Sequence, residues 1–143
     1  MHSMSLRVVL LGCVALLATP LLSDAADPAA AEHYNAGVAS IEARDFDKAL
    51  DNFSQSLTID PDYAEAHYGM GLAYLGMGDS DQALASFTKA VANDPAHAQA
   101  HFNRGKILFN KARTAEAIDA YFAAVQANAE YTEAYFAMGT AQK

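Results

Sequence analysis

Histidine recurs at one position along the chain, and imidazole is a frequent zinc ligand. The three histidines, His33, His67 and His101, are evenly spaced in the sequence. A zinc ion needs all its donors within about 2.2 Å, whereas neighbouring packed helices stand about 10 Å apart. The spacing therefore favours a packing role for these rings, and no metal is predicted.

Two acidic pairs resemble fragments of a calcium loop. Asp45 and Asp47, like Asp60 and Asp62, are separated by a single residue. Neither pair continues into the remaining ligands of such a loop, which end in a bidentate glutamate. Helix caps and solvated turns account for both pairs. No serine, histidine and acid set and no glycine-rich phosphate loop has a catalytic spacing, so we expect a non-enzyme without a cofactor.

The composition is that of one modest folded domain. Of the 143 residues, 52% are hydrophobic and 18% charged, and 9 basic residues face 17 acidic ones. The resulting net charge of -8 repels phosphate backbones and anionic lipid heads. Neither nucleic acid nor a membrane surface is expected as a partner.

Residues 1–25 have the pattern of a secretory signal peptide. Arg7 precedes an apolar run over residues 8–22, and small residues at 23 and 25 complete a cleavage site. The run contains Pro20 and is shorter than the ~20 residues of a membrane span, although a retained anchor remains the alternative. Cleavage after Ala25 removes Cys13 and leaves no cysteine, so an exported protein, periplasmic or extracellular, is expected, with residues 26–29 as a spacer.

One short window sets the organisation of the remaining chain. AHYGMGLAY, residues 66–74, recurs at a constant interval as EHYNAGVAS, AHFNRGKIL and AYFAMGTAQ. We divide the chain into repeats at 30–63, 64–97 and 98–131, followed by a partial repeat at 132–143. The shared columns are Gly37, Gly71, Gly105 and Gly139; Ala49, Ala83 and Ala117; Phe53, Phe87 and Tyr121; and Pro61 with Pro95.

Each repeat predicts two amphipathic helices. In the second repeat, helical spacing first links His67, Met70, Gly71 and Tyr74, and then links Ala83, Phe87 and Ala90. A glycine inside a helix costs about 1 kcal/mol relative to alanine. We attribute Gly71 to a close approach of the two helices, in which the glycine faces the small Ala83.

Turn residues mark the predicted helix ends. Residues 76–79 supply a glycine for one helix end and then Asp79, which can cap the next helix with Gln82 as its capping-box partner. Asp62 and Glu65 predict the same arrangement where the second repeat begins. The prolines of the shared column cannot continue the preceding helices and so end them.

These columns resemble the tetratricopeptide repeat, which has W-x2-L-G-x2-Y followed by A-x3-F and P within a period of about 34 residues. The resemblance covers positions 30 to about 143 and implies an all-α fold, an α-α superhelix of about three and a half repeats. Histidine or Tyr135 stands in the tryptophan column, and further departures are Ser40, Arg104 and Ala129. The last segment, TEAYFAMGTAQK, is either a capping helix, the start of a truncated repeat, or an edge that pairs with another chain.

A second apolar stripe follows the first helix of each repeat. By resemblance, these helices line a concave groove that holds an extended peptide or an amphipathic helix. For the aromatic members of the stripe, packing between repeats is equally consistent with the spacing. The predicted groove residues are Tyr34, Asn35, Val38, Tyr68, Leu72, Phe102, Asn103, Lys106 and Asn110, and the stripe also includes Ile41, Leu75 and Phe109.

Charge is distributed unevenly along the chain. Residues 27–65 hold nine acids and two bases, whereas residues 98–143 hold five bases and four acids. A partner with a basic segment at the N-terminal end and an acidic segment near the C-terminal cations would fit this field, although solvated faces explain the same charges. Some family members clamp a C-terminal carboxylate with lysine, arginine and asparagine. Here only Lys106 supplies a groove cation among Arg104, Lys106, Lys111 and Arg113, so no full clamp is expected.

The sequence thus predicts an exported, non-catalytic adaptor that binds a peptide or helix of a partner protein in cell-envelope assembly or protein biogenesis. The alternative is a structural protein that assembles with itself, its last helix stacking head to tail on the first repeat of another copy.

Overall fold

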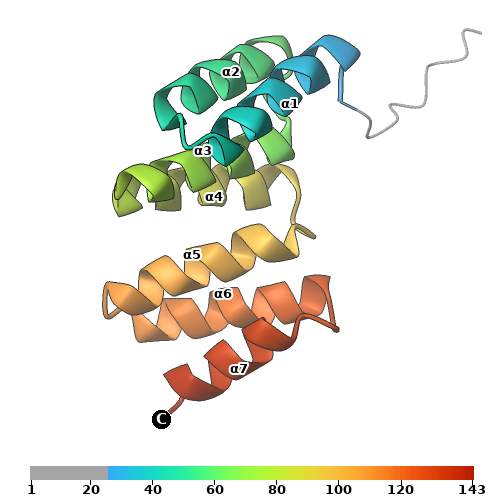
Figure 1. Ribbon diagram of the computed structural model, residues 1–143. Helices are drawn as coiled ribbons and strands as arrows, with labels where there is room; N and C mark the ends of the chain where they lie inside the picture. Colours follow the sequence, from blue (N-terminus) through green and yellow to red (C-terminus); the bar gives the residue numbers. More distant parts are fainter. Residues whose placement is uncertain (1–25) are drawn as a thin grey trace, which may run out of the picture.

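The computed structural model describes residues 26–143, and this part of the chain forms helices without strands (Figure 1). The predicted signal peptide, residues 1–25, lies outside the described residues. The helices are α1 (Pro28–Glu42), α2 (Phe46–Ile59), α3 (Ala64–Met77), α4 (Ser80–Asn93), α5 (Ala98–Asn110), α6 (Thr114–Ala127) and α7 (Thr132–Ala141).

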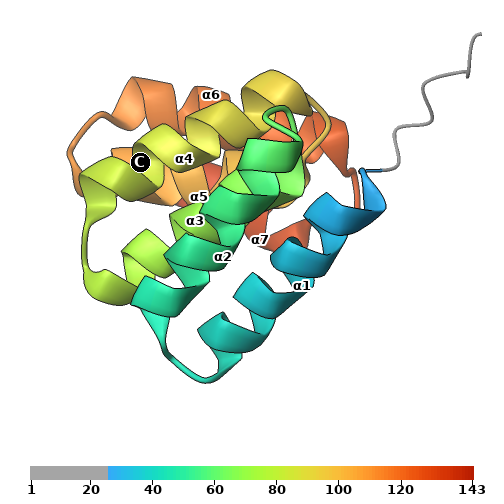
Figure 2. The same ribbon diagram turned by 90° about the horizontal axis from the view of Figure 1, so that it is seen from above.

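The helices pair in chain order and the pairs stack. Short turns join α1 to α2, α3 to α4 and α5 to α6, so the two helices of each pair run antiparallel (Figures 1 and 2). Neighbouring pairs are in contact through α2 and α3 and through α4 and α5, and α7 packs on α6. The predicted all-α superhelix of helical repeats is confirmed.

The core follows the predicted repeat columns. One alanine and one aromatic residue on the second helix of each pair are almost completely buried. These residues are Ala49, Phe53, Ala83, Phe87, Ala117 and Tyr121. Tyr74 is partly buried, while Pro61, Pro95 and Gly139 are exposed.

The buried glycines face aromatic rings rather than alanines, which corrects the sequence interpretation. A Cβ atom built at Gly71 would lie 2.4 Å from the ring of Phe87, and one at Gly37 would lie 2.5 Å from the ring of Phe53. Gly105 stands in the same relation to Tyr121, at 2.6 Å. Each pair therefore places a ring where a side chain would otherwise stand, and contact with that ring offsets the low helix propensity of glycine.

In the second pair, aspartate caps the second helix, α4, as predicted, but no aspartate caps the first helix, α3. Asp79 accepts a hydrogen bond from the backbone N–H of Gln82, at 3.1 Å, at the start of α4. The predicted capping box of Asp62 with Glu65 is wrong, because Tyr63 occupies the cap position of α3. The Asp62 N–H instead donates to Asp60, at 3.2 Å, in the turn that follows α2.

That turn recurs at the exit of each second helix. Oδ1 of Asp60, Asp94 and Asn128 accepts a bond from the backbone N–H two residues later, at 3.2, 3.0 and 2.9 Å. The two acidic pairs therefore include a turn residue, Asp60, and a helix cap, Asp45. The third repeat keeps the turn although Ala129 replaces its proline, because Asn128 supplies the same acceptor.

The first helix begins earlier than the repeat boundary. Asp27 accepts a bond from the Ala29 N–H, at 2.8 Å, and Pro28 occupies the first turn, where its missing N–H costs nothing. The predicted spacer, residues 26–29, is therefore helical from Pro28 onward.

Candidate functional site

Three aromatic clusters recur along the stack, each built from equivalent positions of successive repeats. Each cluster combines a ring on the first helix, a ring on the second helix of the same pair, and a ring just before the first helix of the next repeat. The centroid distances within the clusters run from 4.6 Å to 5.9 Å. The clusters are Tyr34, Phe53 and Tyr63; Tyr68, Phe87 and His97; and Phe102, Tyr121 and Tyr131.

The aromatic members of the predicted groove are thus mainly packing residues. Tyr34, Tyr68 and Phe102 are each partly buried between two successive repeats. Burial raises the pKa of the Tyr34 and Tyr68 hydroxyls, so both remain neutral hydrogen-bonding groups at neutral pH. Of the two interpretations left open by the spacing, packing between repeats describes these rings.

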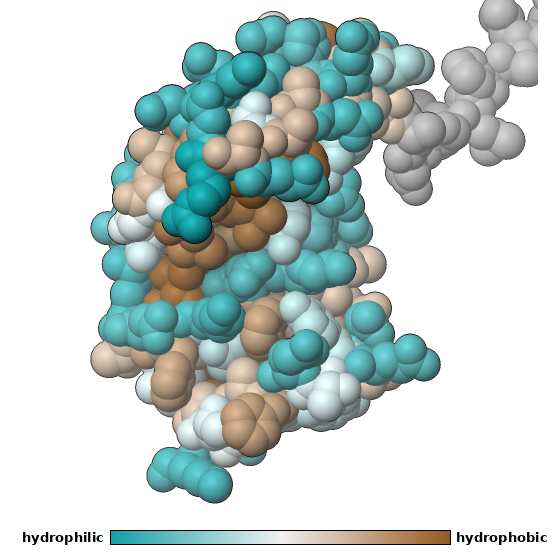
Figure 3. Space-filling view, viewed as in Figure 1, coloured by the Kyte–Doolittle hydropathy of each residue, from teal (hydrophilic) through white to brown (hydrophobic). Residues whose placement is uncertain are grey.

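The other apolar members of the stripe, which do not belong to the aromatic clusters, remain available on the same helices. Leu75 is 36% exposed and Phe109 is 42% exposed, while Val38 and Leu72 are partly covered. Figure 3 shows hydrophobic residues gathered below α1 and toward α5, bordered by hydrophilic ones. We call this surface the strip, and it consists of Val38, Ile41, Leu72, Leu75, Lys106 and Phe109.

Lys106 gives the strip its cation. Its Nζ lies 5.6 Å from the centroid of the Phe102 ring, where the ring face attracts the ammonium group. Two other predicted cations are engaged elsewhere: Lys111 pairs with Asp81 at 2.7 Å, and Arg113 makes a bidentate pair with Glu116. The basic C-terminal half therefore presents less unpaired positive charge than the sequence indicates.

The predicted amide groups divide into two kinds. Asn103 donates from Nδ2 to the Tyr68 hydroxyl, at 3.2 Å, and so links α5 to α3. Asn35 and Asn110 are exposed on α1 and α5. Asn103 is therefore part of the packing between repeats, whereas Asn35 and Asn110 face solvent.

Two of the repeated histidines fasten the turns between repeats. Nε2 of His67 and of His101 donates to the carbonyl oxygen of the proline six residues earlier, at 2.9 Å in both cases. In His101 burial lowers the pKa of the imidazole, and the buried Nδ1 has no hydrogen-bond partner. Within residues 26–143, no three His, Cys, Asp or Glu side chains gather as a metal site.

His97 is a site residue that the sequence analysis does not identify. Its Nδ1 accepts from the Ala100 N–H at 3.3 Å and caps α5, which leaves the Nε2 proton facing Glu65 at 3.3 Å. Its ring also packs on Tyr68 with centroids 4.6 Å apart. The equal spacing of Tyr63, His97 and Tyr131 is the signal that could have revealed this column.

A hollow of about 410 Å³ lies away from the strip, over a different face of α3. His67, Met70 and Tyr74 form one wall, and residues of α2 and α4 form the others. It contains no predicted groove residue.

Comparison with known families settles the classification. A family model described as tetratricopeptide repeat matches residues 68–132, and a second, described as TPR repeat, matches residues 42–78. The chain belongs to the tetratricopeptide repeat family. No curated protein matches the chain. None of the helices of this tetratricopeptide repeat protein within residues 26–143 has the length and apolar character needed to cross a membrane.

Solved tetratricopeptide repeat structures share the fold at low sequence identity. The Sgt2 TPR domain from Aspergillus fumigatus aligns with a TM-score of 0.75 and 23% identity, covering 84% of this chain and 81% of that one. The first TPR of Spaghetti (RPAP3), bound to the HSP90 peptide SRMEEVD, aligns with a TM-score of 0.74 and 19% identity, covering 80% of this chain and 90% of that one. The Yersinia enterocolitica type III secretion chaperone SycD, in complex with a peptide of the translocator YopD, aligns with a TM-score of 0.72 and 18% identity, covering 78% of this chain and 91% of that one.

Proposed function

We propose that this tetratricopeptide repeat protein is an exported, non-catalytic adaptor that binds a segment of a partner protein along the strip. The general role is supported by the family, since solved structures with this fold include peptide complexes. The strip is apolar apart from Lys106, and this composition defines the kind of segment it accepts. Periplasmic or extracellular location, and a part in envelope assembly or protein biogenesis, are proposed from the pattern of residues 1–25.

The observation that carries the proposal is the exposed apolar surface on the first helices. The rings behind it are fixed by the aromatic clusters, so the strip is held rigid before any partner binds. A segment with two or three aliphatic side chains would cover Leu72, Leu75 and Phe109. Burial of such side chains contributes about 25 cal/mol per Å² of apolar area.

Lys106 sets the register and direction of the bound segment. An acidic side chain of the partner would meet its ammonium group beside the Phe102 ring, while the aliphatic side chains extend toward α1. Asn35 and Asn110 would then be available to bond the backbone of the segment. This arrangement needs one acidic residue in the partner and no free C-terminal carboxylate.

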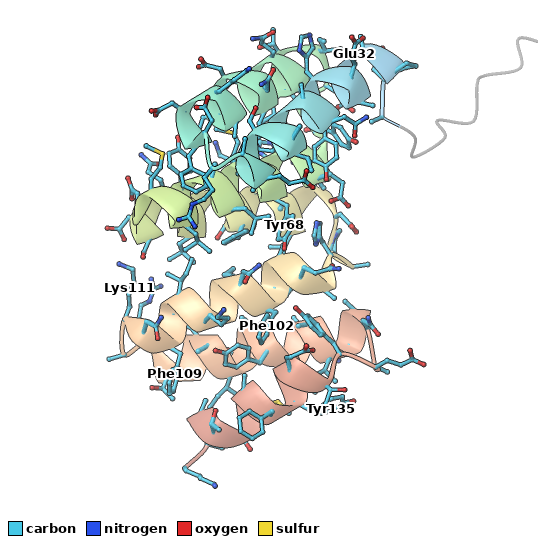
Figure 4. The ribbon with its side chains drawn as sticks, viewed as in Figure 1. Glu32, Tyr68, Phe102, Phe109, Lys111 and Tyr135 are labelled. Carbon is cyan, nitrogen blue, oxygen red and sulfur yellow. The ribbon has the colours of Figure 1, made fainter. Side chains whose placement is uncertain are left out.

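The alternative function, head-to-tail stacking, conflicts with one feature of the first repeat. Ala66, Ala100 and Ala134 are completely buried because each faces the preceding pair of helices. Glu32 occupies the same column in α1 and is exposed (Figure 4). Stacking in the register of the repeats would bury this carboxylate where only a methyl group fits, which costs several kcal/mol.

Selection from a random peptide library against the purified protein tests the proposal. The selected peptides should share aliphatic residues and one acidic residue, and their affinity should fall about tenfold or more with Leu75→Glu or Lys106→Glu. Lys89→Glu, a charge reversal of the same size on α4 outside the strip, is the matched control and should leave affinity unchanged. Selection of no common sequence, or equal losses in all three variants, would contradict the proposal.

A further inference from the structure

Glu65, in the first turn of α3, lies between the first two aromatic clusters. Its Oε2 is 3.3 Å from Nε2 of His97, whose ring packs on Tyr68 on the side of α3 toward α5 (Figure 4). Tyr63, two residues before Glu65, packs on Tyr34 of α1 with ring centroids 5.3 Å apart. The Glu65 side chain is 47% exposed, so a carboxylate among aromatic rings remains accessible from solvent.

The charge of this carboxylate acts on three tyrosines. Burial is the main cause that raises the pKa of the Tyr34 and Tyr63 hydroxyls, and the charge of Glu65 is the next. For Tyr68, burial and then Tyr131 are the larger causes, and Glu65 again raises the pKa. All three hydroxyls therefore stay neutral beside a half-covered negative charge.

No group within residues 26–143 neutralises the Glu65 carboxylate. His97 accepts the Ala100 N–H through Nδ1, so its one proton is on Nε2 and the ring facing Glu65 is uncharged. No lysine or arginine in this part of the chain pairs with Glu65. Residues 27–65 hold nine acids and two bases, so the surrounding field attracts a cation.

We propose that Glu65 and its flanking tyrosines bind a lysine or arginine side chain of the partner segment that lies along the strip. The proposal rests on the proposed function, because Glu65 continues the strip. Leu72 follows Glu65 by seven residues and Leu75 by ten, which places all three on one face of α3. An ammonium or guanidinium group would bond to the carboxylate and lie beside the tyrosine rings, whose faces attract cations.

The Glu65 site and Lys106 together fix the direction of the segment. Lys106 is in the column of Leu72, one repeat later, and Leu72 lies about 10 Å along α3 from Glu65. With about 10 Å between neighbouring helices, the two charged groups are roughly 15 Å apart, which about four or five residues of extended chain span. The partner should therefore carry its basic residue about that far from its acidic one. A segment in the opposite direction would bring both charges to groups of like sign.

The chain itself supplies the variants that test the carboxylate. The column of Glu65 contains Ala31 in α1, Gln99 in α5 and Glu133 in α7. Gln99 shows that an amide fits this position of a first helix. Glu65→Gln keeps an oxygen that can accept from His97 and removes only the charge. Glu133→Gln makes the same change in the same column, on a helix that does not form the strip, and is the matched control.

Isothermal titration calorimetry with library-selected peptides that bind the strip tests the proposal. The peptides should share a basic residue in addition to the acidic and aliphatic ones. Glu65→Gln should weaken their binding about tenfold, and Glu133→Gln should leave it unchanged. Replacing the basic residue of the peptide by norleucine should cause a similar loss, and Glu65→Gln should then have little further effect.

The outcomes separate this site from the strip. Peptides that lose affinity with Leu75→Glu but lack a basic residue, or keep their affinity with Glu65→Gln, would overturn the Glu65 site and leave the proposed function intact. Equal losses with Glu65→Gln and Glu133→Gln would also overturn the site, because they would reflect a general attraction to a negatively charged protein. Selection of no common sequence would overturn the proposed function and the Glu65 site with it.

Discussion

The turn between the two helices of each pair carries a backbone strain that substitution can relieve. Arg44, Gly78 and Ala112 occupy the same position, with φ of 59°, 82° and 59°. In all three turns the next residue donates to a carbonyl five positions back, at 2.9 Å, which requires the left-handed conformation. Only the middle turn has the residue that adopts this conformation without steric cost.

Ala112→Gly should therefore stabilise the protein. The left-handed conformation costs about 1 to 2 kcal/mol for a residue with a side chain. The added freedom of glycine in the unfolded chain costs about 0.4 to 1 kcal/mol in return. The net gain is about 0.5 to 1 kcal/mol, and Arg44→Gly should give a similar gain in the first turn.

Urea denaturation followed by circular dichroism measures this gain. For a slope of about 2 kcal/mol per M, the midpoint should rise by about 0.3 to 0.5 M. Gly78→Ala is the reciprocal variant, and it should lower the midpoint because the added methyl group meets no neighbour and changes only the backbone preference. A lower midpoint for Ala112→Gly, or an unchanged one for Gly78→Ala, would refute the reasoning.

Three further predictions follow from the packing and the hydrogen bonds. Gly71→Ala should lower the free energy of unfolding by about 1 to 3 kcal/mol, because its Cβ would overlap the Phe87 ring. In a double-mutant cycle, Gly71→Ala combined with Phe87→Leu should lower it by less than the sum of the two single changes. Asp79→Ala should lower the free energy of unfolding by about 1 kcal/mol in the same denaturation assay. Asp62→Ala should lower it much less because, of these two aspartates, only Asp79 caps a helix with its side chain. As the pH falls below about 6.5, the unfolded chain binds a proton at His101 before the folded protein does, since burial lowers the pKa in the fold, so stability should fall with pH and should fall less steeply in His101→Gln. The nearby groups that act on this imidazole are Arg104, His97, Asp94 and the Pro95 carbonyl. An equal slope of stability against pH in the original protein and in the His101→Gln variant would mean that His101 does not cause the pH dependence.

The repeat period is sufficient to predict the fold. Each of the shared glycine, alanine and aromatic columns lies in a first or second helix, and the prolines lie beyond the ends of α2 and α4. The period does not reveal which columns touch. The sequence interpretation pairs Gly71 with the small Ala83, but the ring of Phe87 occupies the space, because a planar ring can lie closer to a helix backbone than a neighbouring helix can.

The error at the start of α3 has a different physical origin. Asp62 and Tyr63 are adjacent, and only the position of the first helical hydrogen bond decides which of them is the cap. Asp60 competes for the Asp62 N–H and fixes the boundary one residue later. This competition involves the exit of the preceding helix, so the local cap pattern alone does not include it.

The candidate site could be predicted only in part. Helical spacing places Tyr68, Leu72 and Lys106 on one side of their helices, but in the structure these side chains differ in how deeply they are buried. Tyr68 contacts Phe87 and His97 and accepts a bond from Asn103, so substituting it would damage the packing between repeats. Leu72 and Lys106 belong to the strip. How deeply each side chain is buried depends on the packing of the following repeat, and the spacing of residues within one helix does not reveal that packing.

Nuclear magnetic resonance mapping of a library-selected peptide tests the central claim most directly. Titration into isotope-labelled protein should shift the amide signals of Val38, Leu72, Leu75, Lys106 and Phe109, while residues exposed on α2, α4 and α6 keep theirs. The shifted residues should form this single continuous set on α1, α3 and α5. Shifts centred instead on the hollow beside His67 and Lys89, or spread evenly over the helices, would contradict it.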